Sequence, residues 1–128
     1  MADAKKDKLS QEKFRGRVLI IAASDSGGGA GIQADIKTVT ALGGYAATAI
    51  TAITVQNTLG VSGVHPIPTD VVEAQARAVL DDIRADAIKT GMLGDAAMVE
   101  AVARIIDSAP AAPVVVDPVM VAKGGAGL

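Results

Sequence analysis

The residues best suited to binding chemistry follow short apolar runs along the chain. A glycine-rich turn at residues 24–31 comes directly after the apolar run 18–22 and precedes a segment with helical spacing. Its glycines allow backbone with positive φ and close approach to a ligand. The first N–H groups of a helix are also free to bind a polar group. The turn therefore predicts a binding site between a strand and a helix; the alternative is a tight turn without a ligand.

The turn does not match the two common phosphate-binding fingerprints. The pattern G-x-G-x-x-G requires a glycine where Ile32 stands, and G-x-x-x-x-G-K-[ST] is absent. The sequence thus gives little support to a dinucleotide site or a P-loop.

Two polar side chains near this turn are candidates for ligand recognition. Asp35, which flanks the turn together with Asp25, lies near the start of the expected helix and is either an acceptor for a ligand donor or a surface charge. Gln56 carries both a donor and an acceptor, which suits the edge of a heterocycle, although a polar loop residue explains it equally well.

Three further candidates follow the later strands. Met92 lies in a Thr-Gly-Met-Leu segment, where its thioether either packs on a flat ring or belongs to the core. Asp117 ends a run of three valines, and hydrated Mg²⁺ with substrate phosphates is its natural partner; the alternative is a structural cap. Lys123 is a candidate phosphate contact or a solvated charge, and His65, the only histidine, is assigned no role.

The apolar pattern predicts alternating strands and helices. Strands are expected at 18–22, 45–55, 87–89 and 114–116, with a polar loop at 56–60. Helical stripes are formed by Ile32, Ile36, Val39 and Leu42, by Val72, Ala76, Val79 and Ile83, and by Met98, Val102, Ile105 and Ile106. Expected helix boundaries are Gly43-Gly44 after the first helix, Thr69 or Asp70 before the second and Asp95 before the third.

This order predicts an α/β fold with a mostly parallel sheet covered on both faces. Ligands of such sheets sit outside the carboxyl ends of the strands. The segments 24–31, 56–60, 90–94 and 117–127 all follow strands, so we expect them to line one site.

Composition excludes several classes of protein. The chain has 128 residues, 50% hydrophobic residues, two aromatic residues, no cysteine and a net charge of −2. These values fit one domain without disulfides or thiolate metal sites, and they argue against binding to nucleic acid or to an anionic membrane. Residues 1–17 are polar, lack the apolar region of a signal peptide and are expected to form a tail of a cytoplasmic protein.

Four blocks, at residues 23–38, 50–58, 89–93 and 116–123, resemble the hydroxymethylpyrimidine/phosphomethylpyrimidine kinase family of thiamin biosynthesis. The first block is ASDSGGGAGIQADIKT, and the others follow in the family's order. The resemblance implies a ribokinase-like three-layer α/β/α sandwich. It further implies that residues 18–128 form the N-terminal half of a kinase domain, with a sheet truncated after about four strands.

The same resemblance implies an activity and roles for individual residues. Members of the family use ATP and Mg²⁺ to phosphorylate 4-amino-5-hydroxymethyl-2-methylpyrimidine and then its monophosphate. By similarity, Asp35 and Gln56 would hold the polar edge of the pyrimidine, and Met92 and Val119 would pack against its ring. The backbone at Ala23 would contact the ring, and Asp117 would belong to the metal and phosphate neighbourhood.

The chain also departs from the family in length. Family members are about twice as long, and the other half carries a Gly-Thr-Gly-Cys anion hole, the catalytic cysteine and most ATP contacts. We therefore expect no catalytic residue in this chain, no activity of the 128-residue chain alone, a tendency to aggregate and a homodimer at full length. Two alternatives remain open, a non-catalytic pyrimidine-binding module and a relative of pyridoxal kinase.

Overall fold

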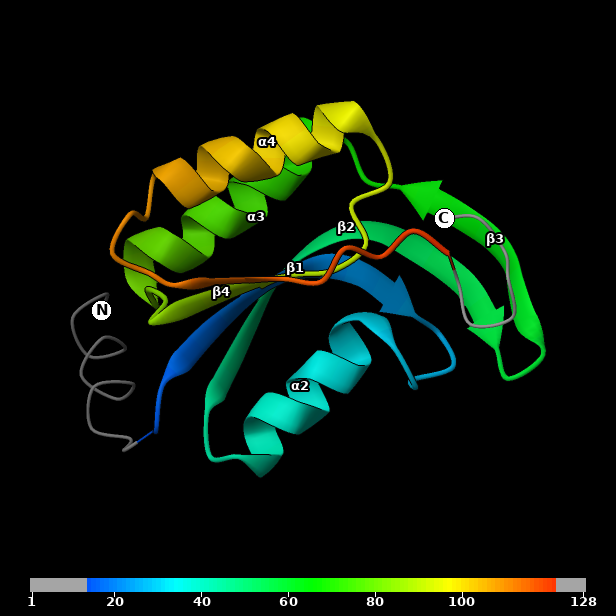
Figure 1. Ribbon diagram of the computed structural model, residues 1–128, viewed down its shortest axis with the longest axis horizontal. Coiled ribbons are helices and arrows are strands. Elements are labelled where there is room, and N and C mark those ends of the chain that lie inside the picture. The colour runs from blue at the N-terminus through cyan, green and yellow to red at the C-terminus, as the bar shows by residue number, and fades with distance from the viewer. Residues whose placement is uncertain (1–13, 122–128) are drawn as a thin grey trace, which may run out of the picture.

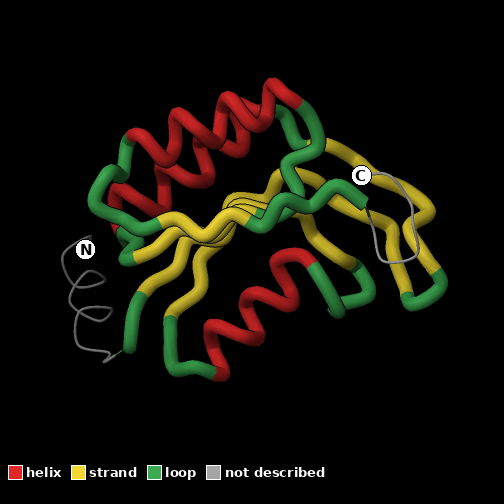
Figure 2. The backbone as a smooth tube through the Cα atoms, in the orientation of Figure 1, coloured by secondary structure: helices red, strands yellow, loops and turns green. Residues whose placement is uncertain are grey.

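A five-stranded sheet in the order β3-β2-β1-β4-β5 separates two layers of helices in the computed structural model, which describes residues 14–121. Figures 1 and 2 show α3 and α4 on one face of the sheet and α2 on the other. The elements are β1 (Arg17–Asp25), α2 (Gly31–Ala41), β2 (Tyr45–Asn57), β3 (Gly60–Pro66), α3 (Thr69–Asp82), β4 (Ala87–Thr90), α4 (Ala96–Asp107) and β5 (Val114–Val116). The expected three-layer α/β architecture is confirmed.

The central strand β1 pairs in parallel with β2 on one side and with β4 on the other, and β4 pairs in parallel with β5. Leu19, Ile20 and Ile21 in its middle are fully buried, as the continuous apolar run predicts. Successive side chains point to opposite faces, so Leu19 and Ile21 pack with α3 and α4, and Ile20 packs with α2. One strand thereby anchors both helical layers.

The polar loop expected at residues 56–60 is shorter in the structure, and the strand at residues 60–66 was not predicted. Strand β2 extends to Asn57, and a further strand, β3, returns antiparallel to it, with Asn57 opposite Gly60. The glycines and prolines of this segment indicated a loop, but an edge strand tolerates them because it pairs on one side only. The described sheet is therefore mixed and has five strands where four were expected.

The ends of the helices follow the predictions in part. Asp95 caps α4 by accepting a hydrogen bond from the backbone N–H of Met98 at 2.8 Å, as expected. Gly43, with φ of +82°, and Gly44 end α2 by donating to the carbonyls of Thr40 and Val39. None of the helices in the described part of the chain is long and apolar enough to cross a membrane.

Three details of the helices were predicted wrongly. Pro68 occupies the N-cap of α3 without a side-chain hydrogen bond, so neither Thr69 nor Asp70 is the cap. Ile83 is the C-cap of α3, one residue beyond the helix. Leu42 is exposed because α2 ends at Ala41, before Leu42 can join the buried stripe.

An ion pair ties the amino ends of β1 and β4 together. The guanidinium Nε of Arg17 lies 3.0 Å from Oδ2 of Asp86, and the backbone N–H of Arg17 donates to the same oxygen at 2.7 Å. These hydrogen bonds, the side-chain bond first, lower the pKa of Asp86. Both side chains are about half exposed, so the pair contributes little to stability.

The start of α2 requires a glycine. Gly31 has φ of +59°, and a Cβ placed there would lie 2.4 Å from the carbonyl oxygen of Ala23 in β1. The helix can begin this close to the strand only because residue 31 has no side chain.

We expect Gly31→Ala to lower the free energy of unfolding of the full-length protein by about 2 kcal/mol or more, because left-handed strain and a backbone clash add. The measurement is the urea unfolding midpoint. Gly29→Ala is the matched control, since a Cβ at Gly29 meets nothing within 4 Å and its φ is ordinary. Equal losses in the two variants would contradict this account of the loop.

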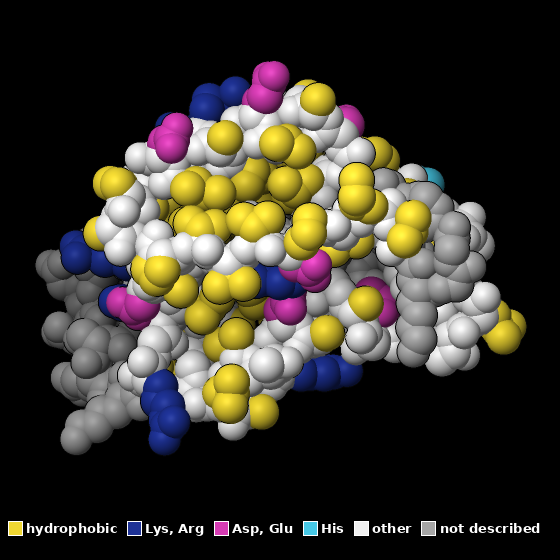
Figure 3. All heavy atoms as spheres, viewed as in Figure 1, with side chains coloured by type: hydrophobic (Ala, Val, Ile, Leu, Met, Phe, Trp, Pro, Cys, Tyr) yellow, Lys and Arg dark blue, Asp and Glu magenta, His cyan; other side chains and the backbone are white. Residues whose placement is uncertain are grey.

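The outer edge of β5 exposes apolar surface in the described part of the chain. Figure 3 shows hydrophobic side chains gathered along this face; the exposed residues there include Val115, Val116, Met120 and Val121. Because an open apolar strand edge pairs readily with another chain, we expect the 128-residue chain to self-associate as its concentration rises. Light scattering after size exclusion measures this. A monomer with one sharp thermal transition would refute it.

Candidate functional site

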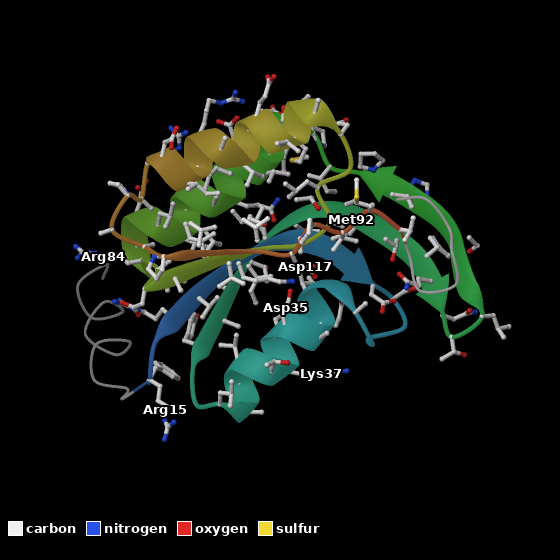
Figure 4. All side chains as sticks on the ribbon, viewed as in Figure 1. Arg15, Asp35, Lys37, Arg84, Met92 and Asp117 are labelled. Carbon is white, nitrogen blue, oxygen red and sulfur yellow. The ribbon has the colours of Figure 1, made fainter. Side chains whose placement is uncertain are left out.

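The carboxyl ends of the parallel strands and the start of α2 enclose a cavity of about 280 Å³. Its lining residues come from five separate segments of the chain: Ala23, Ser24, Asp25, Ala30, Gly31, Ala34, Asp35, Thr54, Gln56, Lys89, Gly91, Met92, Asp117, Val119 and Val121. Figure 4 shows Asp35 and Asp117 close together near the strand ends, with Met92 toward the same side. The structure thus places all four segments that follow the predicted strands around one space.

Six of the seven candidate residues line this cavity: Ala23, Asp35, Gln56, Met92, Asp117 and Val119. The seventh, Lys123, lies outside the described residues. His65, assigned no role, lies on β3 and does not line the cavity.

The carboxylate of Asp25 shapes the glycine turn. Asp25 is only 5% exposed, and it accepts hydrogen bonds from the backbone N–H groups of Gly27, Gly29 and Ala30 at 2.7, 3.0 and 2.8 Å. Three backbone donors satisfy the buried charge and fix the path of the turn. Asp25 was assigned no role from the sequence, although an aspartate just before a glycine run is typical of side-chain-stabilised turns.

A side chain of α2, Gln33, also stabilises the glycine turn through hydrogen bonds. The side chain of Gln33 accepts from the backbone N–H of Asp25 at 2.8 Å and donates to Oγ of Ser24 at 2.7 Å. Both amide atoms are therefore used within the protein, so Gln33 positions the turn. No feature of the sequence distinguishes Gln33 from other residues of the helix.

Ala23 lies at an irregularity of β1, where the register with β2 shifts between Ala22 and Ser24. Such bulges turn the backbone and re-aim side chains, and they are frequent beside binding sites. Ala23, at this irregularity, lines the cavity.

Gln56 lies on β2, and not in a loop as expected. Its backbone N–H donates to Oγ of Ser26 at 2.8 Å, which links the strand to the glycine turn. The hydroxyl of Thr54 donates to the carbonyl of Ser24 at 2.8 Å and lies 3.2 Å from Oε1 of Gln56. The amide of Gln56 is thus held at the edge of the cavity by its strand.

An ion pair spans the middle of the cavity wall. Nζ of Lys89, on β4, lies 2.7 Å from Oδ2 of Asp35, on α2. Asp35 was expected to be an acceptor for a ligand, and the structure gives it a protein partner at one of its two oxygens. Lys89 was missed, although a lysine inside a short buried strand is an unusual residue that could have drawn attention.

Another part of the cavity wall is apolar. Met92, Ala23 and Ala52 form a buried cluster against which Val119 packs. The hydroxyl of Thr51 donates to the carbonyl of Met92 at 2.7 Å and holds the segment after β4 in place. A flat ring fits against such a wall.

Asp117 follows β5 at the rim of the cavity. Its backbone N–H donates to the carbonyl of Thr90 at 3.1 Å, and within residues 14–121 its carboxylate makes no hydrogen bond or ion pair. The described residues contain no cluster of three or more metal-ligating side chains. One free carboxylate nevertheless suits Mg²⁺, which is commonly bound by one or two carboxylates, water and substrate phosphates.

Comparisons with known proteins agree with this geometry. The model of the family described as "Phosphomethylpyrimidine kinase" matches residues 25–128. The hydroxymethylpyrimidine/phosphomethylpyrimidine kinase of Bacillus subtilis is 59% identical over 112 residues, which are 88% of this chain and 41% of that protein. The corresponding kinase of Haemophilus influenzae is 54% identical over 88% of this chain and 42% of its own length.

Solved structures share the fold. Phosphomethylpyrimidine kinase from Clostridium difficile superimposes with a TM-score of 0.80 and 42% identity, over 91% of this chain and 49% of that one. Pyridoxal kinase from Staphylococcus aureus in complex with AMP-PCP and pyridoxal gives a TM-score of 0.73 and 44% identity, over 81% of this chain and 39% of that one.

The chain spans about two fifths of the length of the curated kinases it matches. The family match nevertheless covers every segment that lines the cavity except the first two residues of its wall, Ala23 and Ser24. The α/β sandwich and the high identity to these kinases agree with that match. This chain belongs to the phosphomethylpyrimidine kinase family.

Proposed function

We propose that the full-length protein is a kinase that transfers phosphate from ATP to 4-amino-5-hydroxymethyl-2-methylpyrimidine and to its monophosphate, in thiamin diphosphate biosynthesis. One observation carries the proposal: a cavity of about 280 Å³ combines an apolar wall with polar side chains at its edge. A substituted pyrimidine presents a flat ring and a rim of donors and acceptors, which such a cavity complements.

The residues of this chain serve to bind and orient the substrate. Met92 and Val119 pack against the ring, and Gln56 and Asp35 bind its polar edge. The backbone at Ala23 closes the wall. Phosphoryl transfer depends mainly on positioning and charge stabilisation, so holding the hydroxymethyl group in a fixed direction is a contribution to rate.

Asp117 is the residue we assign to the metal and phosphate neighbourhood, and Lys123 is a candidate phosphate contact. Mg²⁺ when bound neutralises phosphate charge and orients the transferred group. The carboxylate of Asp117, without an internal partner among the described residues, supports this assignment. ATP as the donor is supported by the kinase names of the relatives and by the AMP-PCP complex of the S. aureus enzyme.

A second candidate activity is phosphorylation of pyridoxal. Its support is the similarity of this chain to the S. aureus pyridoxal kinase solved with pyridoxal, at 45% identity and a TM-score of 0.76. Pyridoxal also carries a hydroxymethyl group on a flat nitrogen heterocycle, so the same apolar wall suits it.

We further propose that the full-length protein acts as a homodimer in the cytoplasm on small molecules, without a nucleic-acid partner. The net charge of −2 and the presence of only two aromatic residues argue against a nucleic-acid partner, and the absence of cysteine fits a reducing cytoplasm. The homodimer is what the family resemblance implies.

The direct test incubates the full-length protein with the pyrimidine, ATP and Mg²⁺ and follows phosphorylated products by chromatography, with pyridoxal in a parallel reaction. We expect Gln56→Ala to raise the KM for the pyrimidine by about ten- to a hundredfold, because a buried polar contact is lost. Leu59→Ala, at the exposed tip of the β2–β3 hairpin, is the control and should not change KM.

Absence of any phosphorylated pyrimidine would reject the proposed activity. Turnover of pyridoxal alone would favour the second candidate. The 128-residue chain by itself is expected to transfer no phosphate, and turnover by that purified chain would contradict the view that it supplies only the substrate-binding half.

We expect Asp117→Asn to lower kcat by about a hundredfold while leaving the KM for the pyrimidine nearly unchanged, because the lost charge faces the phosphates and not the ring. Raising the Mg²⁺ concentration should recover part of the rate. Asp107→Asn, at the exposed end of α4, is the matched control. An equal effect of the two substitutions would remove Asp117 from the metal neighbourhood.

A further inference from the structure

The ion pair between Lys89 and Asp35 differs from the other ion pairs of the described residues. Its two side chains are 24% and 22% exposed, whereas each of the other three pairs includes a side chain that is at least 40% exposed. Removing two charges from water is costly, and such a pair is often no more stabilising than apolar residues of the same volume. Its presence in a cavity wall therefore calls for a functional explanation.

The geometry keeps both partners at the cavity. Lys89 lies on β4 opposite Ile20 of β1, so its position is fixed by the centre of the sheet. A Cβ at Gly91 would lie 3.3 Å from Nζ of Lys89, so the glycine leaves room for the ammonium group. Asp35 reaches the same place from α2, on one face of the sheet.

The pair still has free hydrogen-bonding capacity. Lys89 is the one cationic side chain that lines the cavity among residues 14–121, and its ammonium carries three N–H donors. One of them is used by Oδ2 of Asp35, and no second partner of Nζ occurs among those residues. Oδ1 of Asp35 likewise has no hydrogen-bond donor within that part of the chain.

We propose that Lys89 determines substrate specificity by fixing Asp35 as an anionic acceptor and by offering its own N–H beside it. This inference rests on the proposed kinase function and deepens it. A ligand must then present an N–H donor next to an acceptor, as an exocyclic amine beside a ring nitrogen does. The pair thus selects an aminopyrimidine.

The same pair disfavours pyridoxal, because the order of donor and acceptor along that edge is reversed. Counted from the hydroxymethyl group, the aminopyrimidine has an amine followed by a ring nitrogen, whereas pyridoxal has an aldehyde followed by a hydroxyl, so the half-buried carboxylate of Asp35 would face the aldehyde oxygen instead of an N–H. Sites built to hydrogen-bond a particular group reject analogues that lack it, because their buried polar atoms are left unpaired. Lys89 acts here through Asp35 and through its own donors, and it takes no part in the transfer of phosphate.

The test uses the full-length protein and compares Lys89→Met, Lys89→Arg, Asp35→Asn and the double variant Lys89→Met/Asp35→Asn. For Lys89→Met we expect the KM for the aminopyrimidine to rise about tenfold or more and kcat to change by less than about threefold. The ratio of kcat/KM for aminopyrimidine to that for pyridoxal should fall about tenfold. Lys89→Arg should recover part of this selectivity, and the double variant should lose less than the sum of the single losses.

Arg17→Met is the control, because it breaks an ion pair on the same two strands at their opposite ends. It should leave KM and selectivity unchanged, and thermal unfolding of each variant separates loss of specificity from loss of fold. If Lys89→Met does not fold, Lys89→Arg and Asp35→Asn carry the comparison.

The outcomes separate this inference from the proposed function. If the wild type phosphorylates the aminopyrimidine and the Lys89 variants keep its KM and selectivity, Lys89 has no role in specificity and the kinase function stands. If the wild type turns over neither compound, the kinase function fails. Calorimetric titration of wild type and Lys89→Met with both compounds then still decides whether Lys89 discriminates between them.

Discussion

Parallel pairing on both sides of β1 is the constraint on which the cavity depends. Because β2 and β4 run in the same direction as β1, the three strands have their carboxyl ends on the same side of the sheet. The segments that follow them therefore begin close together. β5 adds a fourth segment through its parallel pairing with β4. Side chains up to 98 residues apart in the sequence, from Ala23 to Val121, are brought to one cavity without any contact specific to a ligand.

The cavity lies at the carboxyl ends of the parallel strands, and the buried carboxylate of Asp25 determines the shape of the glycine turn in its wall. By binding three N–H groups of the turn, it fixes a stretch of glycines that would otherwise have many backbone conformations. Gly31 completes the arrangement because only a residue without Cβ can approach Ala23 so closely. The wall of the cavity beside α2 is therefore ordered before a ligand arrives, which lowers the entropic cost of binding.

Much of this organisation could be predicted from the sequence, because it depends on local signals. Neighbouring residue types are enough to predict the apolar run of β1, the apolar stripe of α4 and the Asp95 cap of that helix. Residue types and positions after strands indicated Asp35, Gln56, Met92, Asp117 and Lys123, and the family resemblance added the substrate class, Ala23 and Val119. Strand β3 was missed because an edge strand needs no apolar alternation and tolerates the glycines and prolines that usually mark loops.

The partners of polar side chains could not be predicted, since they depend on packing between distant elements. Lys89 and Asp35 are 54 residues apart, and only the crossing of α2 over the sheet brings them together. The three carboxylates of the cavity show the same dependence. Backbone N–H groups satisfy Asp25 and an ammonium group satisfies Asp35, whereas Asp117 keeps its charge without a partner among the described residues.

The three carboxylates of the cavity therefore differ in how far their charge is compensated by protein groups. Within residues 14–121, the cavity carboxylate without a hydrogen-bond or ion-pair partner is that of Asp117, just after β5, whereas the carboxylate at the glycine turn accepts three backbone N–H bonds. Met92 and Val119 make part of the cavity wall apolar. Under the proposed function, a flat heterocycle packs on Met92 and Val119 and directs its reacting group toward Asp117. This orientation would follow from how the three carboxylates are neutralised to different degrees within one small space.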